Sequence, residues 1–143
     1  MKTITIDQKR SKLVFEHVME IQSKKYALDY GRLALSAPTM LRRAGLMQAL
    51  AFFEAKGSRP AKADQGEAEQ TGKTHYRELV ERWLVELIAL GRVPDGTTSL
   101  RGYAETCCLV EYMRLTREVL ALAQWHRRFA QSVLKVEPGE DVQ

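Results

Sequence analysis

Cysteine is scarce in this sequence, and both a signal-like start and a long apolar run are absent. The only two cysteines, Cys107 and Cys108, are adjacent, which suits neither a structural disulfide nor the C-x-x-C pattern of redox and zinc sites. On a helix they would point about 100° apart, so we expect one in the core and one at its flank. Residues 1–10 lack a secretory signal, and charged residues interrupt every stretch approaching the ~18 apolar residues that span a bilayer. We expect a cytoplasmic protein with reduced cysteines and no membrane-spanning segment.

Motifs for catalysis, metal binding and cofactor binding are also missing. His17, His75 and His126 are scattered, and none stands three or four residues from another His or Cys, as zinc sites require. The string GEAEQTGKT, residues 66–74, resembles a phosphate-binding loop, but five residues separate its first glycine from the Gly-Lys pair, where four are needed. The sequence therefore predicts no metal, no cofactor and no enzymatic activity, although motifs do not test carboxylates that converge only in the fold.

Apolar side chains recur every three or four residues over most of the chain, which is the spacing of amphipathic helices. Apart from the short Ile4/Ile6 pair, the alternating pattern of strands is absent. A chain of 143 residues, 45% of them apolar, is long enough to bury one core. The sequence therefore predicts a single all-α domain over residues 1–143, a compact bundle of five or six helices.

Local signals set the expected helix boundaries. Pro38 favours a helix start, because a proline in the first turn loses no backbone hydrogen bond. Thr74 is an expected N-cap, as is Thr98 or Ser99. The polar residues 58–72 predict a mobile linker, and the acidic residues 136–143 predict a frayed tail. The expected helices are residues 7–27, with 27–35 either continuing the first or bending at Gly31, then 38–57, 74–91, and 98–135 with a break near 110–112.

Positive charge is concentrated in the first half of the sequence. Residues 1–63 hold twelve Lys and Arg against five Asp and Glu, whereas residues 64–143 hold ten against thirteen. Such a field favours a polyanion such as nucleic acid, since contacts to phosphates require only positive side chains at backbone spacing. The alternative is that these charges form ordinary solvated helix faces. The basic clusters are Lys9, Arg10 and Lys12; Lys24 and Lys25; Arg42 and Arg43; and Arg127 and Arg128.

Two stretches, PTMLRRAGLMQALAFFEAKG at residues 38–57 and EYMRLTREVLALAQWHRRFAQSVL at residues 111–134, are similar to a known family. They resemble the small all-α subunit of Cmr, the type III-B CRISPR RNA-guided effector complex. Most of the matched residues are helix-packing positions, and we expect Trp125 and Phe129 to be core anchors. The matched positions are Pro38, Gly45, Leu46, Gln48, Phe53, Tyr112, Thr116, Glu118, Ala121, Trp125, Arg128, Phe129 and Ala130.

The resemblance implies a non-catalytic subunit that is present in several copies and lines the groove where crRNA and target RNA pair. Its expected partners are other Cmr subunits, copies of itself, and the backbones of crRNA and target RNA. The alternative function is a helical interaction module that docks other subunits without touching nucleic acid, and a small helical nuclease is a third. The candidate RNA-binding residues are Lys9, Arg10, Lys24, Lys25, Arg42, Arg43 and Arg128.

Overall fold

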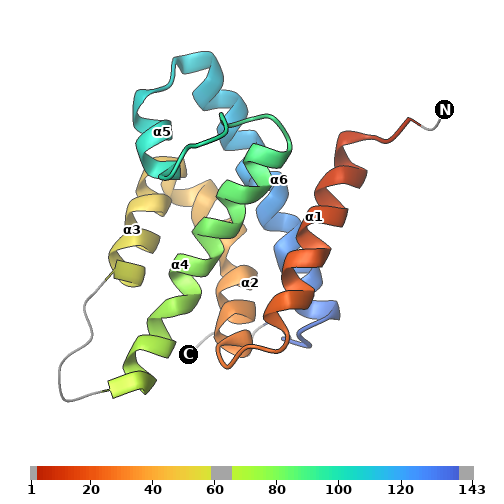
Figure 1. Cartoon of the computed structure of the whole chain (residues 1–143), viewed down its shortest axis with the longest axis vertical. Coiled ribbons are helices and arrows are strands. Elements are labelled where there is room, and N and C mark those ends of the chain that lie inside the picture. Colours follow the sequence, from red (N-terminus) through yellow and green to blue (C-terminus); the bar gives the residue numbers. More distant parts are fainter. Residues whose placement is uncertain (1–2, 59–65, 139–143) are drawn as a thin grey trace.

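The computed structural model describes residues 3–58 and 66–138. Within these ranges the chain forms six α-helices and no strand, which confirms the expected all-α bundle (Figure 1). Ile4 and Ile6 form no strand, since Ile6 begins the first helix. The helices are α1 (Ile6–Ile21), α2 (Ala27–Ala44), α3 (Leu46–Ser58), α4 (Gly66–Ala89), α5 (Leu100–Thr106) and α6 (Leu109–Ser132).

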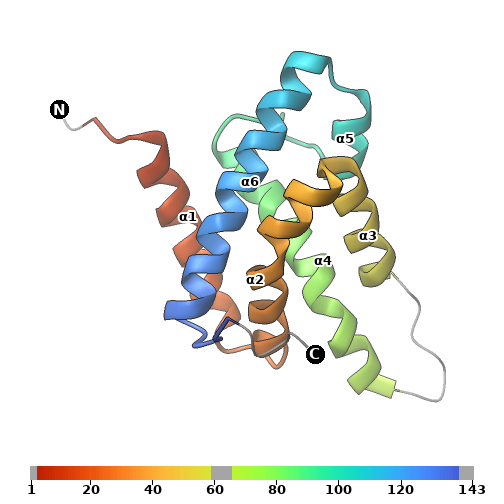
Figure 2. The same ribbon diagram turned by 180° about the vertical axis from the view of Figure 1, so that it is seen from behind.

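Helix α6 lies between α1 and α2, and the three helices form one side of the molecule (Figure 2). We call this side the α1–α6–α2 layer, defined as residues 6–44 and 109–132. Helices α3 and α4 pack against each other on the other side, and the short α5 packs at one end of them (Figure 1). Because α6 comes last in the chain and packs on the first two helices, the layer joins the two ends of the sequence into one surface.

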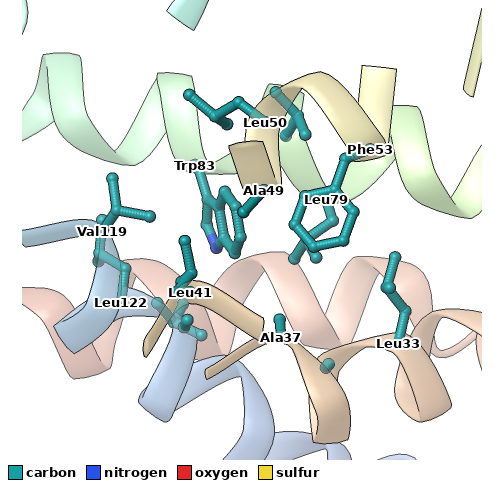
Figure 3. Packing of buried hydrophobic residues seen from close by; sticks show 14 of the residues in the cluster. Leu33, Ala37, Leu41, Ala49, Leu50, Phe53, Leu79, Trp83, Val119 and Leu122 are labelled. Atoms are coloured by element: carbon teal, nitrogen blue, oxygen red, sulfur yellow. The ribbon is translucent and has the colours of Figure 1, made fainter. Parts of the chain in front are cut away.

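The core lies between the two sides and follows the helical spacing of the sequence. On α4, Leu79, Trp83 and Leu87 recur every four residues and are fully buried. They meet Phe53 of α3 and Leu41 of α2, as Figure 3 shows for the neighbourhood of Trp83. Each such side chain contributes roughly 1.5–3 kcal/mol by leaving water. The α4 stripe is therefore the apolar spine against which both sides pack.

The predicted helix start at Pro38 is wrong, because this residue lies inside α2. The proline ring removes one backbone hydrogen bond of the helix. The acceptor that loses its donor is Ala34 O, four residues before Pro38, and the next carbonyl, Leu35 O, accepts from Arg127 Nη1 of α6 at 2.6 Å. The chain turns instead at Gly45, whose φ of 86° lies in the region that glycine enters without steric cost. The single helix expected over residues 38–57 is therefore divided between α2 and α3.

Helix α4 begins at Gly66 rather than after Thr74, so residues 66–72 of the predicted linker are helical. This stretch contains Glu67, Ala68 and Gln70, which are residue types that favour helix. Residues 59–65 of that linker lie outside the described residues. The GEAEQTGKT string thus belongs to helical backbone, which differs from the glycine-rich loop that cradles a phosphate.

Helices α5 and α6 are separated at Cys107 and Cys108, slightly before the expected break. Ser99 caps α5 as one of the two predicted candidates, since its Oγ accepts from the Gly102 N–H at 3.0 Å. Both cysteines have extended backbone, with ψ of 161° and 167°. Cys107 is half-buried and Cys108 is exposed, so neither is the core residue that helical spacing predicted.

The first part of the expected frayed tail is packed. Val136 is only 1% exposed, and its N–H donates to Ala130 O at 3.1 Å. It covers Gly31 of α2, where an added Cβ would lie 2.4 Å from Val136 Cγ2. Gly31 thus neither bends nor ends the helix, but leaves space for the returning chain. Residues 139–143 of the predicted tail lie outside the described residues.

Candidate nucleic-acid interface

The fold concentrates positive charge on one side of the molecule. Residues 6–44 and 109–132, the α1–α6–α2 layer, hold twelve Lys and Arg against six Asp and Glu. Residues 46–108, which form α3, α4, α5 and their connections, hold eight against nine. The boundary therefore runs between two sides of the fold, because α6 adds four arginines to the basic N-terminal helices. A polyanion would meet the layer first.

Within the described ranges, the arginines on the α3 to α5 side are occupied by protein acceptors. Arg82 donates to Glu78 at 2.8 Å and also pairs with Glu20 of α1. Arg101 pairs with Glu54 at 2.7 Å and with Glu105. Arg77 donates to Gly57 O at 2.9 Å, and Arg92 pairs with Glu118 at 3.2 Å. These cations hold helices together and offer little charge to a partner.

Six of the seven candidate RNA-binding residues are exposed, and the part of the chain that the structure describes contains no ion pair to any of them. Their charges are therefore available to solvent or to a partner. Lys9 lies on α1, and Arg128 lies near the end of α6. The remaining four are Lys24 and Lys25 in the connection between α1 and α2, and Arg42 and Arg43 at the end of α2.

Arg10 differs from the other six candidates. Its guanidinium is half-buried and makes a two-pronged contact with Glu118 of α6, with Nη2 donating to Oε1 at 3.1 Å. It also donates to Asp7 at 3.3 Å. Glu118 is only 2% exposed, so Arg10 compensates a buried carboxylate and joins α1 to α6. This residue is thus occupied within the fold.

The exposed candidates are spread along the layer rather than gathered at a point. Lys24 and Lys25 precede α2, whereas Arg42 and Arg43 are in its last turn. With 18 residues, α2 is about 27 Å long. That separation is too large for one small anion, and it suits successive phosphates of an extended chain.

Sequence reasoning missed Arg117, an exposed residue of α6 without an ion pair among the described residues. It stands eleven residues before Arg128, which is about three helical turns, so both lie on one face of α6. The eleven-residue spacing is the sequence signal for Arg117, because this residue does not belong to an adjacent basic pair. Arg127, by contrast, points to Leu35 O and is used for packing.

A buried polar chain joins the four longest helices below this surface. Tyr30 Oη lies 2.8 Å from His126 Nδ1, and His126 Nε2 lies 2.9 Å from Glu86. His17 Nδ1 lies 2.6 Å from the same carboxylate. His126 is fully buried in the core. Tyr30, His126 and Glu86 are all closed off from solvent, so these buried polar contacts hold the four helices together.

The electrostatics of Glu86 follow from this burial. Desolvation raises the pKa of its carboxyl, but the charge and hydrogen bond of His126 and the hydrogen bond of His17 outweigh it, so the pKa is lowered overall. Burial also raises the pKa of Tyr30 well above its ordinary value. Glu86 is therefore an ionised acceptor that the surrounding donors stabilise.

A metal-binding cluster and a membrane-spanning helix are both absent from the described ranges, 3–58 and 66–138. These ranges contain no group of three or more His, Cys, Asp or Glu side chains placed to hold a metal ion. None of the helices there combines the length and the apolar character that crossing a membrane requires.

The architecture thus defines a small all-helical protein with one basic side and a core crossed by buried polar contacts. Comparison with known proteins assigns the family: residues 6–133 match the family described as "CRISPR-associated protein (Cas_Cmr5)". The chain belongs to the Cmr5 family, which confirms the resemblance to the small all-α Cmr subunit.

One relative and one solved structure agree with this family. The relative, "CRISPR system Cmr subunit Cmr5" of Thermus thermophilus, is 34% identical over 122 residues, covering 85% of this chain and 89% of that protein. A crystal structure of a CRISPR-associated Cmr5 family protein from the same organism superposes with a TM-score of 0.70. It is 31% identical, and the match covers 92% of this chain and 99% of that one.

Proposed function

We propose that this protein is a non-catalytic structural subunit of a type III-B CRISPR effector complex in the cytoplasm. Several copies stack along the duplex of crRNA and target RNA, beside other Cmr subunits. The α1–α6–α2 layer contacts the RNA backbone and leaves target cleavage to neighbouring subunits. The family membership supports a place in the complex, and the unpaired cations of the layer support the contact with RNA.

The observation that carries the RNA contact is the difference between occupied and available cations. Arg77, Arg82 and Arg101 on the far side are held by protein acceptors. On the layer, Arg42, Arg43 and the other exposed candidates have no ion pair within the described ranges. Within each adjacent pair, Lys24–Lys25 and Arg42–Arg43, the like charges repel each other unless a partner of opposite charge neutralises them. A phosphate chain supplies that partner, whereas an uncharged surface does not.

The second candidate function is a helical module that docks other subunits without touching RNA. An apolar patch at the start of α6 favours protein contacts there, since Leu109 is 72% exposed, Val110 56% and Met113 47%. Surface patches of this kind mark interaction sites. The patch and the basic clusters are different surfaces, so a protein contact at the patch is compatible with RNA at the cations. The two functions differ only in whether the layer binds RNA.

Charge reversal on the layer tests the RNA contact. Changing Arg42→Glu and Arg43→Glu together should weaken retention of target RNA by the assembled complex and leave helicity intact. If the two residues contact phosphates, the slope of log affinity against log salt should flatten by roughly 1.4 to 1.8, at about 0.7 for each contact to a single strand and about 0.9 for each contact to a double helix. Filter binding over a salt series measures this slope.

A pair of single reversals provides the matched control. Arg128→Glu lies on the layer, whereas Lys56→Glu lies on α3 and lacks an ion pair among the described residues. Arg128→Glu should flatten the slope by roughly 0.7 to 0.9, and Lys56→Glu should leave it unchanged. Equal slopes for the two variants and the unmodified complex would reject the RNA contact and favour the docking module.

A further inference from the structure

A groove between α1 and α6 is lined by aromatic rings. Phe15 of α1 and Trp125 and Phe129 of α6 contribute to its walls, together with Lys12. The Trp125 and Phe129 rings are stacked with centroids 5.5 Å apart, and Phe15 meets Phe129 edge-on at 5.3 Å. The three rings therefore line an open groove at the surface of the bundle.

Trp125 and Phe129 were expected to be core anchors, and the structure places both at the surface, only half-buried. His126 takes the inward position instead, because it bonds to Tyr30 and Glu86. Because neighbouring residues of a helix point about 100° apart, the inward direction of His126 leaves Trp125 and Phe129 facing α1. Phe15 is 42% exposed, so an aromatic face remains open to a partner.

The charges around the groove fit an anionic ligand. Lys12 lines it and is exposed, and the exposed Arg128 precedes Phe129 on α6. Asp7 also lines the groove, but its Oδ1 accepts from Trp125 Nε1 at 3.0 Å and from Arg10 at 3.3 Å. These donors lower the pKa of Asp7, with the hydrogen bond from Trp125 as the first cause. Asp7 is thus an ionised carboxylate whose charge Arg10 offsets, and Lys12 is the exposed cation of the groove wall, with the exposed Arg128 one residue from Phe129 on α6.

We propose that this groove binds an unstacked base of single-stranded RNA, with the aromatic rings contacting the base and Lys12 and Arg128 contacting the flanking phosphates. Aromatic rings beside cations are the combination that proteins use to bind single-stranded nucleic acids, since every base offers a π-face and every linkage a charge. The inference rests on the proposed contact between the layer and RNA. It adds a base contact to what is otherwise a phosphate contact.

A protein segment is the competing occupant, because exposed Phe and Met side chains also occur in protein interfaces. The cations favour RNA, since an apolar helix would gain little from Lys12 and Arg128. The test therefore has to separate base contact, phosphate contact and protein contact.

Intrinsic fluorescence gives a direct readout, because the chain has two tryptophans and Trp83 is fully buried. Oligouridylate should quench Trp125 in the full-length protein, and an abasic oligomer of the same length should bind without quenching. Phe15→Leu should raise the Kd for oligouridylate about tenfold and leave the Kd for the abasic oligomer unchanged. Phe52→Leu is the matched control, since Phe52 is 40% exposed and lies on α3, away from the groove.

The alternative outcomes overturn different statements. Equal binding of both oligomers without quenching would reject the base site and keep the phosphate contact. Failure of both oligomers to bind, at low salt and high protein concentration, would reject the base site and count against the proposed function as well. If oligouridylate does not quench Trp125 and Phe15→Leu instead releases a neighbouring subunit from the assembled complex, the groove is a protein interface.

Discussion

The two sides of this bundle use the same kinds of charged residue for different purposes. On the α3 to α5 side, arginines such as Arg82 and Arg101 pair with acids from neighbouring helices. On the α1–α6–α2 layer, Arg42, Arg43 and Arg128 are exposed and have no ion pair within residues 3–58 and 66–138. Whether a cation is paired therefore predicts its availability to a partner better than the net charge of its side of the molecule does. A cation that holds two helices is part of the fold, whereas an unpaired cation beside others is available to a partner.

Arg10 and Arg128 make the same distinction within the layer itself. Arg10 is directed at the buried Glu118, while Arg128 is exposed near the end of α6. Substitution of the first should therefore disturb packing, and substitution of the second should disturb only binding. The following predictions test this separation between buried and exposed charge, beginning with the largest expected effect.

Removal of a buried partner should have the largest effect. Glu86→Gln takes the negative charge from a fully buried site that faces His126 and His17. We expect the free energy of unfolding to fall by about 3 kcal/mol, because the donors lose a charged acceptor that they cannot replace with water. Chemical denaturation measures this loss. Glu111→Gln is the control, because it removes an exposed pair with Arg114 and should cost at most about 0.5 kcal/mol. Similar losses in both variants would contradict the comparison.

Acid should also destabilise the protein by protonating Glu86, and we expect this effect to be smaller than that of Glu86→Gln. The folded pKa of Glu86 is lowered, so its contribution is present above the ordinary pKa of a glutamate and is lost as the pH falls through the lowered value. Unfolding midpoints measured from neutral pH into this acidic range should therefore decline. In Glu86→Gln the decline should be shallower, although other paired carboxylates such as Glu20 retain their share. An identical decline in both proteins would show that Glu86 is not linked to folding.

Neutral substitution of exposed cations should have the smallest effect on stability. Arg42→Ala with Arg43→Ala removes two charges without ion pairs among the described residues, from the last turn of α2. The expected change in the free energy of unfolding is within about 0.5 kcal/mol per site. Thermal melting measures it. A large loss would mean that the pair serves the fold, and the distinction between the two sides would fail.

The fold was predictable where amphipathic spacing is long, as in the helix that carries Leu79, Trp83 and Leu87. The boundaries of the helices were less predictable from the sequence. Pro38 has the same signature at a helix start and inside a helix that tolerates one lost backbone bond, and here the distant helix α6 packs along α2 and supports it through the proline. Gly45 becomes decisive only through its positive φ, which the sequence does not display.

The interior polar chain shows a second limit of sequence reasoning. Glu86 stands three residues after Trp83 and therefore shares the apolar face of α4, a spacing that marks an inward carboxylate. Trp125 and His126 are adjacent, and either could continue the apolar stripe of α6. Only Tyr30 and Glu86 decide that the histidine turns inward. The contacts of His126 with Tyr30 and Glu86 therefore determine that Trp125 faces the groove.

Ultraviolet crosslinking of the assembled complex to its RNA, followed by mass spectrometry of the crosslinked peptides, tests the central claim most directly. The account predicts crosslinks within residues 6–44 and 109–132, the layer that carries the exposed, unpaired candidates such as Arg42, Arg43 and Arg128. Crosslinks confined to residues 46–108, or a complex that retains RNA without any crosslink to this chain, would contradict it.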